Sequence, residues 1–465
     1  TCGLGIAMLK RLAERVKTHS EECAEVPETL FLEGGADCTD ADRQAKPLLH
    51  LARFASYCRR GDFVGMDPRA VELLENYPER PSRELAELFF RMGKSYYYRV
   101  FRKEFNTIEE RRQFLQRSLA WSQNAIVELK GLEEDSDVIL WSIRARVNIS
   151  SALKLMHRYS EAEVRLREAL ALALEKKDDY YDGVYDRVTA PIYFNLSLLL
   201  CDWGNDEDLV EAETYLKRAE KLYSMRDSGL REIYVDRVRS QLSDLYSRTG
   251  RFDRAVELAM PALRSRKDRL ARADDSKRAV RQVEYARALT NAVRALSECV
   301  ARGLSCGPGP EGQLEEVQQW LVEFDAEVLP EEYQQGMLLL VRAAACAAAG
   351  DPGECRGHYM QALPLLSGDD ADQEQVAEHL VAYRSGLERA GEQFAGDAIV
   401  VQQKIVSSLV ARIREVTTFS PGVRGLSRTR NKLAAEWSHL QSMCRTYGVQ
   451  RPVKELSAAV DEALH

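Results

Sequence analysis

One short segment of the sequence carries three aspartates, in the order Asp178–Asp179–Tyr180–Tyr181–Asp182. Carboxylates at this spacing on one helix face can bind Mg²⁺ ions, which in turn neutralise a diphosphate. The segment follows Glu175–Lys176–Lys177 and precedes Gly183, where a helical pattern ends. A polar turn between two helices is therefore the main interpretation, and a metal site is the alternative.

The acidic segment also matches a known motif. Its DDxxD order resembles the metal–diphosphate motif of isoprenoid synthases, which implies an all-α, Mg²⁺-dependent enzyme. The second metal motif of that family is matched in part by Asn205, Asp206 and Glu213, but Leu209 replaces its hydroxyl residue. A synthase-like enzyme that uses Asp178–Asp182 is kept as an alternative function.

Two other patterns fall short of a site. Gly93–Lys94–Ser95 looks like the end of a phosphate-binding loop, but that loop needs a glycine where Leu88 stands. Cys346, Cys355 and His358 offer three metal ligands without an evident fourth, whereas structural zinc takes four. We therefore predict no metal, no cofactor and no catalytic residue, and hence a protein that is not an enzyme.

Three side-chain amides recur at nearly constant spacing. Asn148, Asn195 and Gln241 are separated by 47 and 46 residues, and each precedes a large apolar residue. An amide carries both a donor and an acceptor, so a row of amides can pair with the backbone of an extended peptide. We interpret the three as a peptide-binding ladder.

Charged and aromatic side chains near the ladder extend this interpretation. A cationic side chain can bind an acidic side chain or a terminal carboxylate, and an aromatic ring can form a pocket wall. The candidate cations are Arg91, Lys94, Arg144 and Lys154, and the candidate aromatic residues are Phe90, Tyr97, Tyr98 and Phe194.

Helix-pair repeats are the elements that would position these side chains. Between Val235 and Leu263, one helical pattern ends at Gly250 and a second begins near Phe252. The order is large, small, aromatic, turn glycine, aromatic, small, small, large. Its residues are Leu242, Ser243, Tyr246, Gly250, Phe252, Ala255, Ala262 and Leu263.

The same order recurs elsewhere and resembles the tetratricopeptide repeat. It is seen at Ile149–Leu170, at Tyr193–Ala219, at Ala343–Leu363 and, in part, at Met92–Tyr96. The resemblance covers roughly residues 48–367, and peptide-binding members of this family have asparagine ladders at the equivalent place. The period departs from the standard of about 34 residues, because Gly204 to Gly250 is 46 residues. HEAT-like repeats, with a period of about 40 to 47, are a structural alternative.

These repeats predict the fold class and the domains. One helix pair cannot bury its apolar face alone, so neighbouring pairs must stack. We expect an all-α, right-handed α-solenoid of antiparallel helix pairs with long helices. Residues 1–44 are expected to form an N-terminal helix and loop, residues 45–368 the solenoid, and residues 369–465 a C-terminal helical or capping region. Pro191, Pro261, Pro330 and Pro452 are interpreted as first turns or breaks of helices.

Composition limits the possible partners. The net charge is −8, which argues against a nucleic-acid binder, and the basic run from Arg264 to Arg272 is interpreted as a solvated helix face. No apolar stretch is long enough to span a membrane. The ten cysteines are expected to be reduced, which indicates a cytoplasmic protein.

The predicted function is that of a scaffold or adaptor. It would bind an extended peptide or a helix of another protein in a groove, as an independent adaptor or as the sensor arm of a larger regulator. A structural subunit of a large assembly is a further alternative. The sequence does not define the oligomeric state.

Overall fold

The computed structural model describes most residues between 83 and 464. The residues outside the description are 1–82, 102–104, 106, 131, 133–135, 178–183, 226–230, 305–308, 325–328, 330–331, 350–351, 367–372, 420–424, 450 and 465. The expected N-terminal helix and loop, the acidic segment Asp178–Asp182 and both expected domain boundaries lie outside the described residues.

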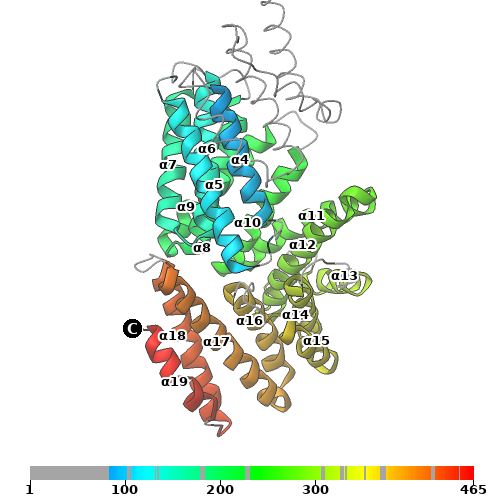
Figure 1. The fold of residues 1–465 in the computed structure, drawn as a ribbon. Helices are drawn as coiled ribbons and strands as arrows, with labels where there is room; N and C mark the ends of the chain where they lie inside the picture. Colours follow the sequence, from blue (N-terminus) through cyan, green and yellow to red (C-terminus); the bar gives the residue numbers. More distant parts are fainter. Residues whose placement is uncertain are drawn as a thin grey trace, which may run out of the picture. The chain divides into compact units, whose positions relative to one another are not determined.

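All regular structure in the described part of the chain is helical (Figure 1). The chain divides into two compact units, Thr1–Val188 and Thr189–His465. The described helices of the first unit are α4 (Arg83–Phe101), α5 (Ile108–Leu129), α6 (Ser136–Leu155) and α7 (Tyr159–Glu175). Helix α8 (Val184–Trp203) contains the division between the units.

The second unit is also built of helices, and their lengths vary. Its further helices are α9 (Asp206–Ser224), α10 (Arg231–Arg248), α11 (Phe252–Ala271), α12 (Asp275–Ala301), α13 (Pro310–Glu323), α14 (Glu332–Ala349), α15 (Pro352–Leu365), α16 (Gln373–Ala390), η4 (Glu392–Phe394), α17 (Ala395–Phe419), α18 (Gly425–Thr446) and α19 (Arg451–Leu464).

Packing follows a helix-pair order within each unit. Consecutive helices pack against one another, as in α4 with α5, α10 with α11 and α14 with α15. Several first helices also pack against the first helix of the next pair, as in α4 with α6, α10 with α12 and α14 with α16. The expectation of an all-α protein built from stacked helix pairs is confirmed.

Small residues stand where helix axes approach closely. Gly93 of α4 faces Ser118 and Ser122 of α5, and the Ser118 hydroxyl donates to the Gly93 carbonyl at 2.7 Å. Ser243 of α10 donates to the carbonyl of Ala255 in α11 at 2.9 Å. A larger side chain at such a position would push the two backbones apart.

The turns between paired helices use left-handed backbone. After α10, Gly250 has a φ of 75°, and the next amide, of Arg251, donates to the Tyr246 carbonyl at 2.8 Å. After α6, the equivalent position is His157, with a φ of 58°, and the Arg158 amide donates to the Leu153 carbonyl at 2.9 Å. These bonds satisfy carbonyls that the helix end would leave unpaired.

The repeat order read from the sequence is confirmed where it is described. The eight positions from Leu242 to Leu263 fall on α10, the Gly250 turn and α11, and all except the turn glycine are buried. Pro452 lies in the first turn of α19, as predicted. Pro191 and Pro261, however, lie inside α8 and α11. Buried apolar neighbours on both helices stabilise them enough to override the helix-breaking effect of proline.

Two expectations about polar residues need correction. Arg266 of the basic run is buried, and its guanidinium donates to Ser240 at 2.7 Å and to the Glu284 carbonyl at 2.9 Å. Burial lowers its pKa to about 10. Cys299 is disulfide-bonded, whereas Cys201, Cys346, Cys355 and Cys444 form no disulfide. Neighbours on other helices decide the burial of Arg266, and residue spacing along the chain does not reveal them.

Replacing Gly93 by alanine tests the close approach of α4 and α5. The new Cβ would lie 2.3 Å from the Ser122 hydroxyl and 2.8 Å from the Ser118 carbonyl. We expect the free energy of unfolding, measured by urea denaturation, to fall by about 1 to 3 kcal/mol. Gly357→Ala is the control, because open space surrounds that helical glycine. Equal stability of both variants would contradict this account of the packing.

Candidate functional site

The three amides of the predicted ladder have different surroundings. Asn148 is only 7% exposed, and its amide donates to the hydroxyl of Ser122 at 2.6 Å, both within the first unit. In the second unit, Asn195 is half-buried and donates to the Pro191 carbonyl at 2.8 Å. Gln241 is half-buried on α10. Asn195 and Gln241 therefore keep more exposed surface than Asn148.

Three of the predicted cations gather on α4 and α6 in the first unit. We name Arg91, Lys94 and Arg144 the α4–α6 cation cluster. The Lys94 ammonium lies 5.9 Å from the ring centroid of Phe90 and 5.5 Å from that of Tyr98. These distances fit cation–π contacts, so two of the predicted aromatic residues belong to the same surface.

The first and third cations of the cluster are also held in place. Arg144 lies 4.9 Å from the ring of Trp141, which packs 5.3 Å from Phe90. The Arg91 guanidinium donates to Glu87 at 3.0 Å. Helices α4 and α6 therefore present one surface of rings and cations.

The positive charges of Lys94, Arg91 and Arg144 repel one another on this surface. Partial burial lowers the pKa of the Lys94 ammonium, and the positive charges of Arg144 and Arg91 lower it further. No carboxylate of the described residues forms an ion pair with Lys94. An anion placed here would relieve the repulsion between the three cations.

Two other predicted residues lie apart from the cluster. Lys154 stands in the last turn of α6, ten positions after Arg144 and so about 15 Å along the helix. Phe194 is half-buried on α8 in the second unit, where Arg237 lies 5.7 Å from its ring centroid. Of the four predicted cations, the structure thus brings together three.

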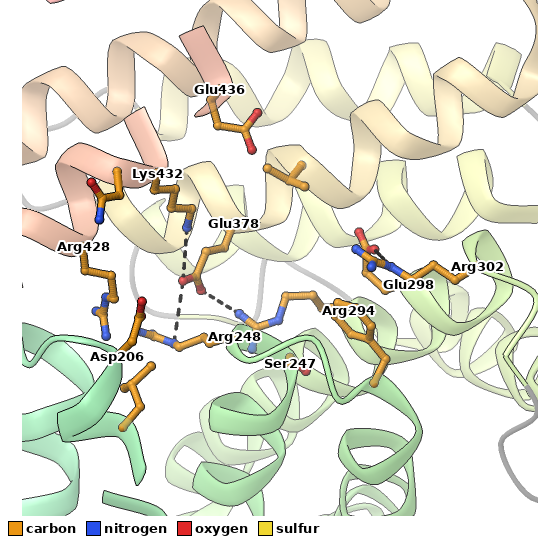
Figure 2. Close-up of a pocket in the computed structure, with 14 residues that line it drawn as sticks. Asp206, Ser247, Arg248, Arg294, Glu298, Arg302, Glu378, Arg428, Lys432 and Glu436 are labelled. Carbon is orange, nitrogen blue, oxygen red and sulfur yellow. Dashed lines mark hydrogen bonds and ion pairs between the residues drawn. The ribbon is translucent and has the colours of Figure 1, made fainter. Parts of the chain in front are cut away.

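A pocket in the second unit was not predicted from the sequence. Its volume is about 390 Å³, and its walls come from α9, α10, α11, α12, α16 and α18 (Figure 2). We name it the Glu378 pocket, after the carboxylate at its centre. Leu209, Phe252 and Val381 form its apolar part, and most of the remaining wall is charged.

Glu378 binds cations from three other helices. Its carboxylate lies 2.8 Å from Arg294 of α12, 3.4 Å from Lys432 of α18 and 3.7 Å from Arg248 of α10. Arg248 and Arg294 also pair with Asp244 of α10. Burial alone would raise the pKa of Glu378, but the three cations outweigh it and hold that pKa well below its usual range.

His379 lies next to this network and is 3% exposed. Burial lowers the pKa of its imidazole to about 3, and the positive charge of Arg294 adds to the effect, while Glu378 and Asp244 oppose it. The histidine is therefore neutral in the folded protein at ordinary pH.

One local signal could have indicated the pocket. Arg294 interrupts an apolar run on α12, Ala292–Val293–Arg294–Ala295–Leu296, and a charge among buried apolar residues needs a partner. The partner residues come from helices far away in sequence, so the pocket itself could not be assembled from spacing.

The residues that partly match a second metal motif have other partners. Asn205 caps α9, where its side chain accepts from the Asp208 amide at 2.9 Å. Glu213 pairs with Lys217 at 2.7 Å and Arg251 at 2.8 Å. Despite burial, these bonds lower the pKa of Glu213 to about 2. No group of three or more potential metal ligands occurs in the part of the chain that is described.

The buried imidazole makes stability depend on pH. His379 has a folded pKa of about 3, below its unfolded value of about 6.5. Below pH 6.5 the His379 imidazole therefore binds a proton in the unfolded chain, whereas it stays neutral in the folded chain down to about pH 3. The free energy of unfolding should fall by up to about 1.4 kcal/mol per pH unit between pH 6.5 and 3 on account of this group.

Urea denaturation at pH 7.5, 6 and 5 checks this dependence. His379→Gln should reduce the slope below pH 6.5, although His358, whose pKa burial also lowers, keeps part of it. Gln361→Ala, at an exposed position on α15 that does not titrate, is the control and should keep the wild-type slope. An unchanged slope in His379→Gln would contradict the assignment.

No family model and no curated protein matches the chain. Among solved structures, it is similar to the apo form of RapI, at 11% identity and a TM-score of 0.43, over 69% of this chain and 97% of that one. It is similar to the apo form of the quorum sensor NprR from B. thuringiensis, at 10% identity and a TM-score of 0.40, over 83% and 97%. A third is the Rap conjugation gene regulator of the plasmid pLS20 in complex with the Phr* peptide, at 11% identity and a TM-score of 0.38, over 85% and 96%.

Two further findings complete the description. None of the described helices is long and apolar enough to cross a membrane. By the helix-pair packing within its units, the described part of the chain has an all-α fold of stacked helix pairs.

Proposed function

We propose that this protein binds an extended segment of another protein, and that the α4–α6 cation cluster takes an acidic group of that segment. The observation that supports this most strongly is the exposed Lys94 ammonium beside Arg91 and Arg144. Like charges gathered at one surface cost free energy, and an acidic partner removes that cost.

The rings beside the cations supply a second kind of contact. Phe90, Tyr98 and Trp141 lie around Lys94 and Arg144. Tyr98 is an exposed large aromatic residue, and aromatic residues with arginine are enriched at the energetic centres of interfaces. A partner segment with an acidic and an apolar residue two positions apart fits both, because every second side chain of an extended chain faces the same surface.

The amide ladder remains a prediction and forms the second part of this proposal. Asn195 and Gln241 would pair with the backbone of the bound segment in the second unit, because each keeps exposed surface. We assign Asn148 a positioning role, because its amide donates to Ser122, the serine that faces Gly93.

We also propose the cytoplasm as the site of action and place no enzymatic step in the function. Four described cysteines form no disulfide, as is usual in a reducing compartment. The disulfide of Cys299 is the exception. The synthase-like alternative depends on Asp178–Asp182, which lie outside the described residues.

Charge removal at Lys94 tests the acidic partner. The probe is a short fluorescent peptide in which glutamate and leucine take turns at every second position, with serine between them, and anisotropy is the measurement. We expect Lys94→Gln to weaken binding by about tenfold, the effect of about 1.4 kcal/mol. Binding should also weaken as salt concentration rises.

Two controls make this test specific. Arg112→Gln removes an exposed charge on α5, where Arg112 pairs with Glu109 at 3.3 Å, and should leave affinity unchanged. A peptide with glutamine in place of glutamate should bind weakly to every variant. Equal affinity of the wild type and Lys94→Gln for the acidic peptide would refute the role of this cluster.

The ladder is tested separately. Affinity capture from native lysate compares the wild type with Asn195→Ala/Gln241→Ala, after circular dichroism shows equal folding. We expect the double variant to lose a partner that the wild type retains. The matched control is Gln319→Ala/Gln361→Ala, which removes two exposed amides on α13 and α15. Recovery of the same partners by all three proteins would remove the ladder from the proposal.

A further inference from the structure

The wall of the Glu378 pocket carries more positive than negative charge. Five cationic residues line it: Arg248, Arg294, Arg302, Arg428 and Lys432. The four acidic residues of the wall are Asp206, Glu298, Glu378 and Glu436.

Three of these carboxylates are already paired with arginines, and Glu378 is the first of them, at 2.8 Å from Arg294. Glu298 pairs with Arg302 at 3.1 Å, and Glu436 pairs at 2.6 Å with Arg384, a residue outside the wall. The cations around Glu378 hold its pKa well below the usual range, whereas burial is the main cause of the low pKa of His379.

Two buried polar atoms on the wall have no hydrogen-bond partner among the described residues. They are the hydroxyl of Ser247, which is 8% exposed, and Nε of Arg294, which is 6% exposed. A buried polar group without a partner destabilises the fold, so such atoms indicate a ligand or a structural water. Arg294 Nε can only donate a hydrogen bond, and Ser247 can donate one as well, so acceptor oxygens are the partners that fit them.

The apolar part of the wall fits an apolar group on a bound molecule. Leu209, Phe252 and Val381 lie on the same pocket as the cations. A volume of about 390 Å³ falls in the range of small-molecule sites, which runs from about 300 to 1,000 Å³. The pocket therefore has room for a small organic body as well as for an anionic group.

We propose that the Glu378 pocket is a binding site for a small molecule that carries an oxyanion, a carboxylate or a phosphate, on an apolar body. The oxyanion accepts hydrogen bonds from Arg294 Nε and the Ser247 hydroxyl. Arg302, whose side chain is 56% exposed, contributes at the solvent side of the pocket. The apolar body lies against Phe252, Leu209 and Val381.

Binding at this pocket would also stabilise the packing of four helices. Arg294, Ser247, Glu378 and Lys432 come from α12, α10, α16 and α18. A ligand that touches these helices binds only the folded arrangement, so it shifts the equilibrium away from local opening. The pocket belongs to the second unit and is independent of the α4–α6 cation cluster.

The probes for this site are phenyl phosphate and phenylacetate, which carry the two oxyanions on a similar apolar ring. Isothermal titration at constant ionic strength measures their affinity for the full chain. We expect at least one of them to bind at a single saturable site, and the better probe identifies the oxyanion. Ser247→Ala and Arg302→Gln should each weaken its binding by about tenfold.

A control and a second measurement complete the experiment. Arg264→Gln removes an exposed cation of α11 that pairs with Glu316 at 2.8 Å, and it should bind the probe as the wild type does. Amide hydrogen exchange of wild type with the probe should show added protection in α16 and α18. The proposal is overturned if neither probe binds the wild type, or if Ser247→Ala and Arg302→Gln both bind with wild-type affinity.

Discussion

Close contact between helix backbones is the constraint on which the rest of this structure depends. Gly386 of α16 shows it most directly, since a Cβ there would lie 2.4 Å from the Cβ of Ala347 in α14. Such positions let neighbouring helix pairs approach until their larger side chains interdigitate. They also fix the register of each pair, because a shift by one residue would place a large side chain at the crossing. Every polar site described for this chain lies on helices positioned in this way.

Charge inside the second unit follows from that packing. Once α10, α12, α16 and α18 are brought together, Glu378 can remain ionised because three cations from separate helices surround it. The same proximity keeps His379 neutral. Removing one partner of such a buried network leaves an uncompensated buried charge, which lowers the stability of the fold. The network therefore favours the one helix arrangement in which every charge is paired.

The two candidate sites differ in how far the sequence could predict them. Arg91 and Lys94 lie three positions apart on α4, so helical periodicity already places them on one face, and adjacent first helices bring Arg144 nearby. The Glu378 pocket has no such local rule, because Arg248 and Lys432 are separated by 184 residues along the chain. The sequence predicts the amide ladder better than the Glu378 pocket but less well than the α4–α6 cation cluster. Its spacing follows the repeat, but the burial of Asn148 depends on its contact with Ser122 of α5.

The sequence by itself determined the helix pairs, the turn at Gly250 and the small residues at the helix crossings, because these follow from interactions between residues close together in the chain. Only the tertiary structure decided that Arg266 is buried, that Pro261 lies inside a helix and that Arg294, Glu378 and Lys432 form one network. The physical reason is that burial and charge pairing depend on neighbours from other helices. Their free energies exceed the local preferences that a sequence pattern records.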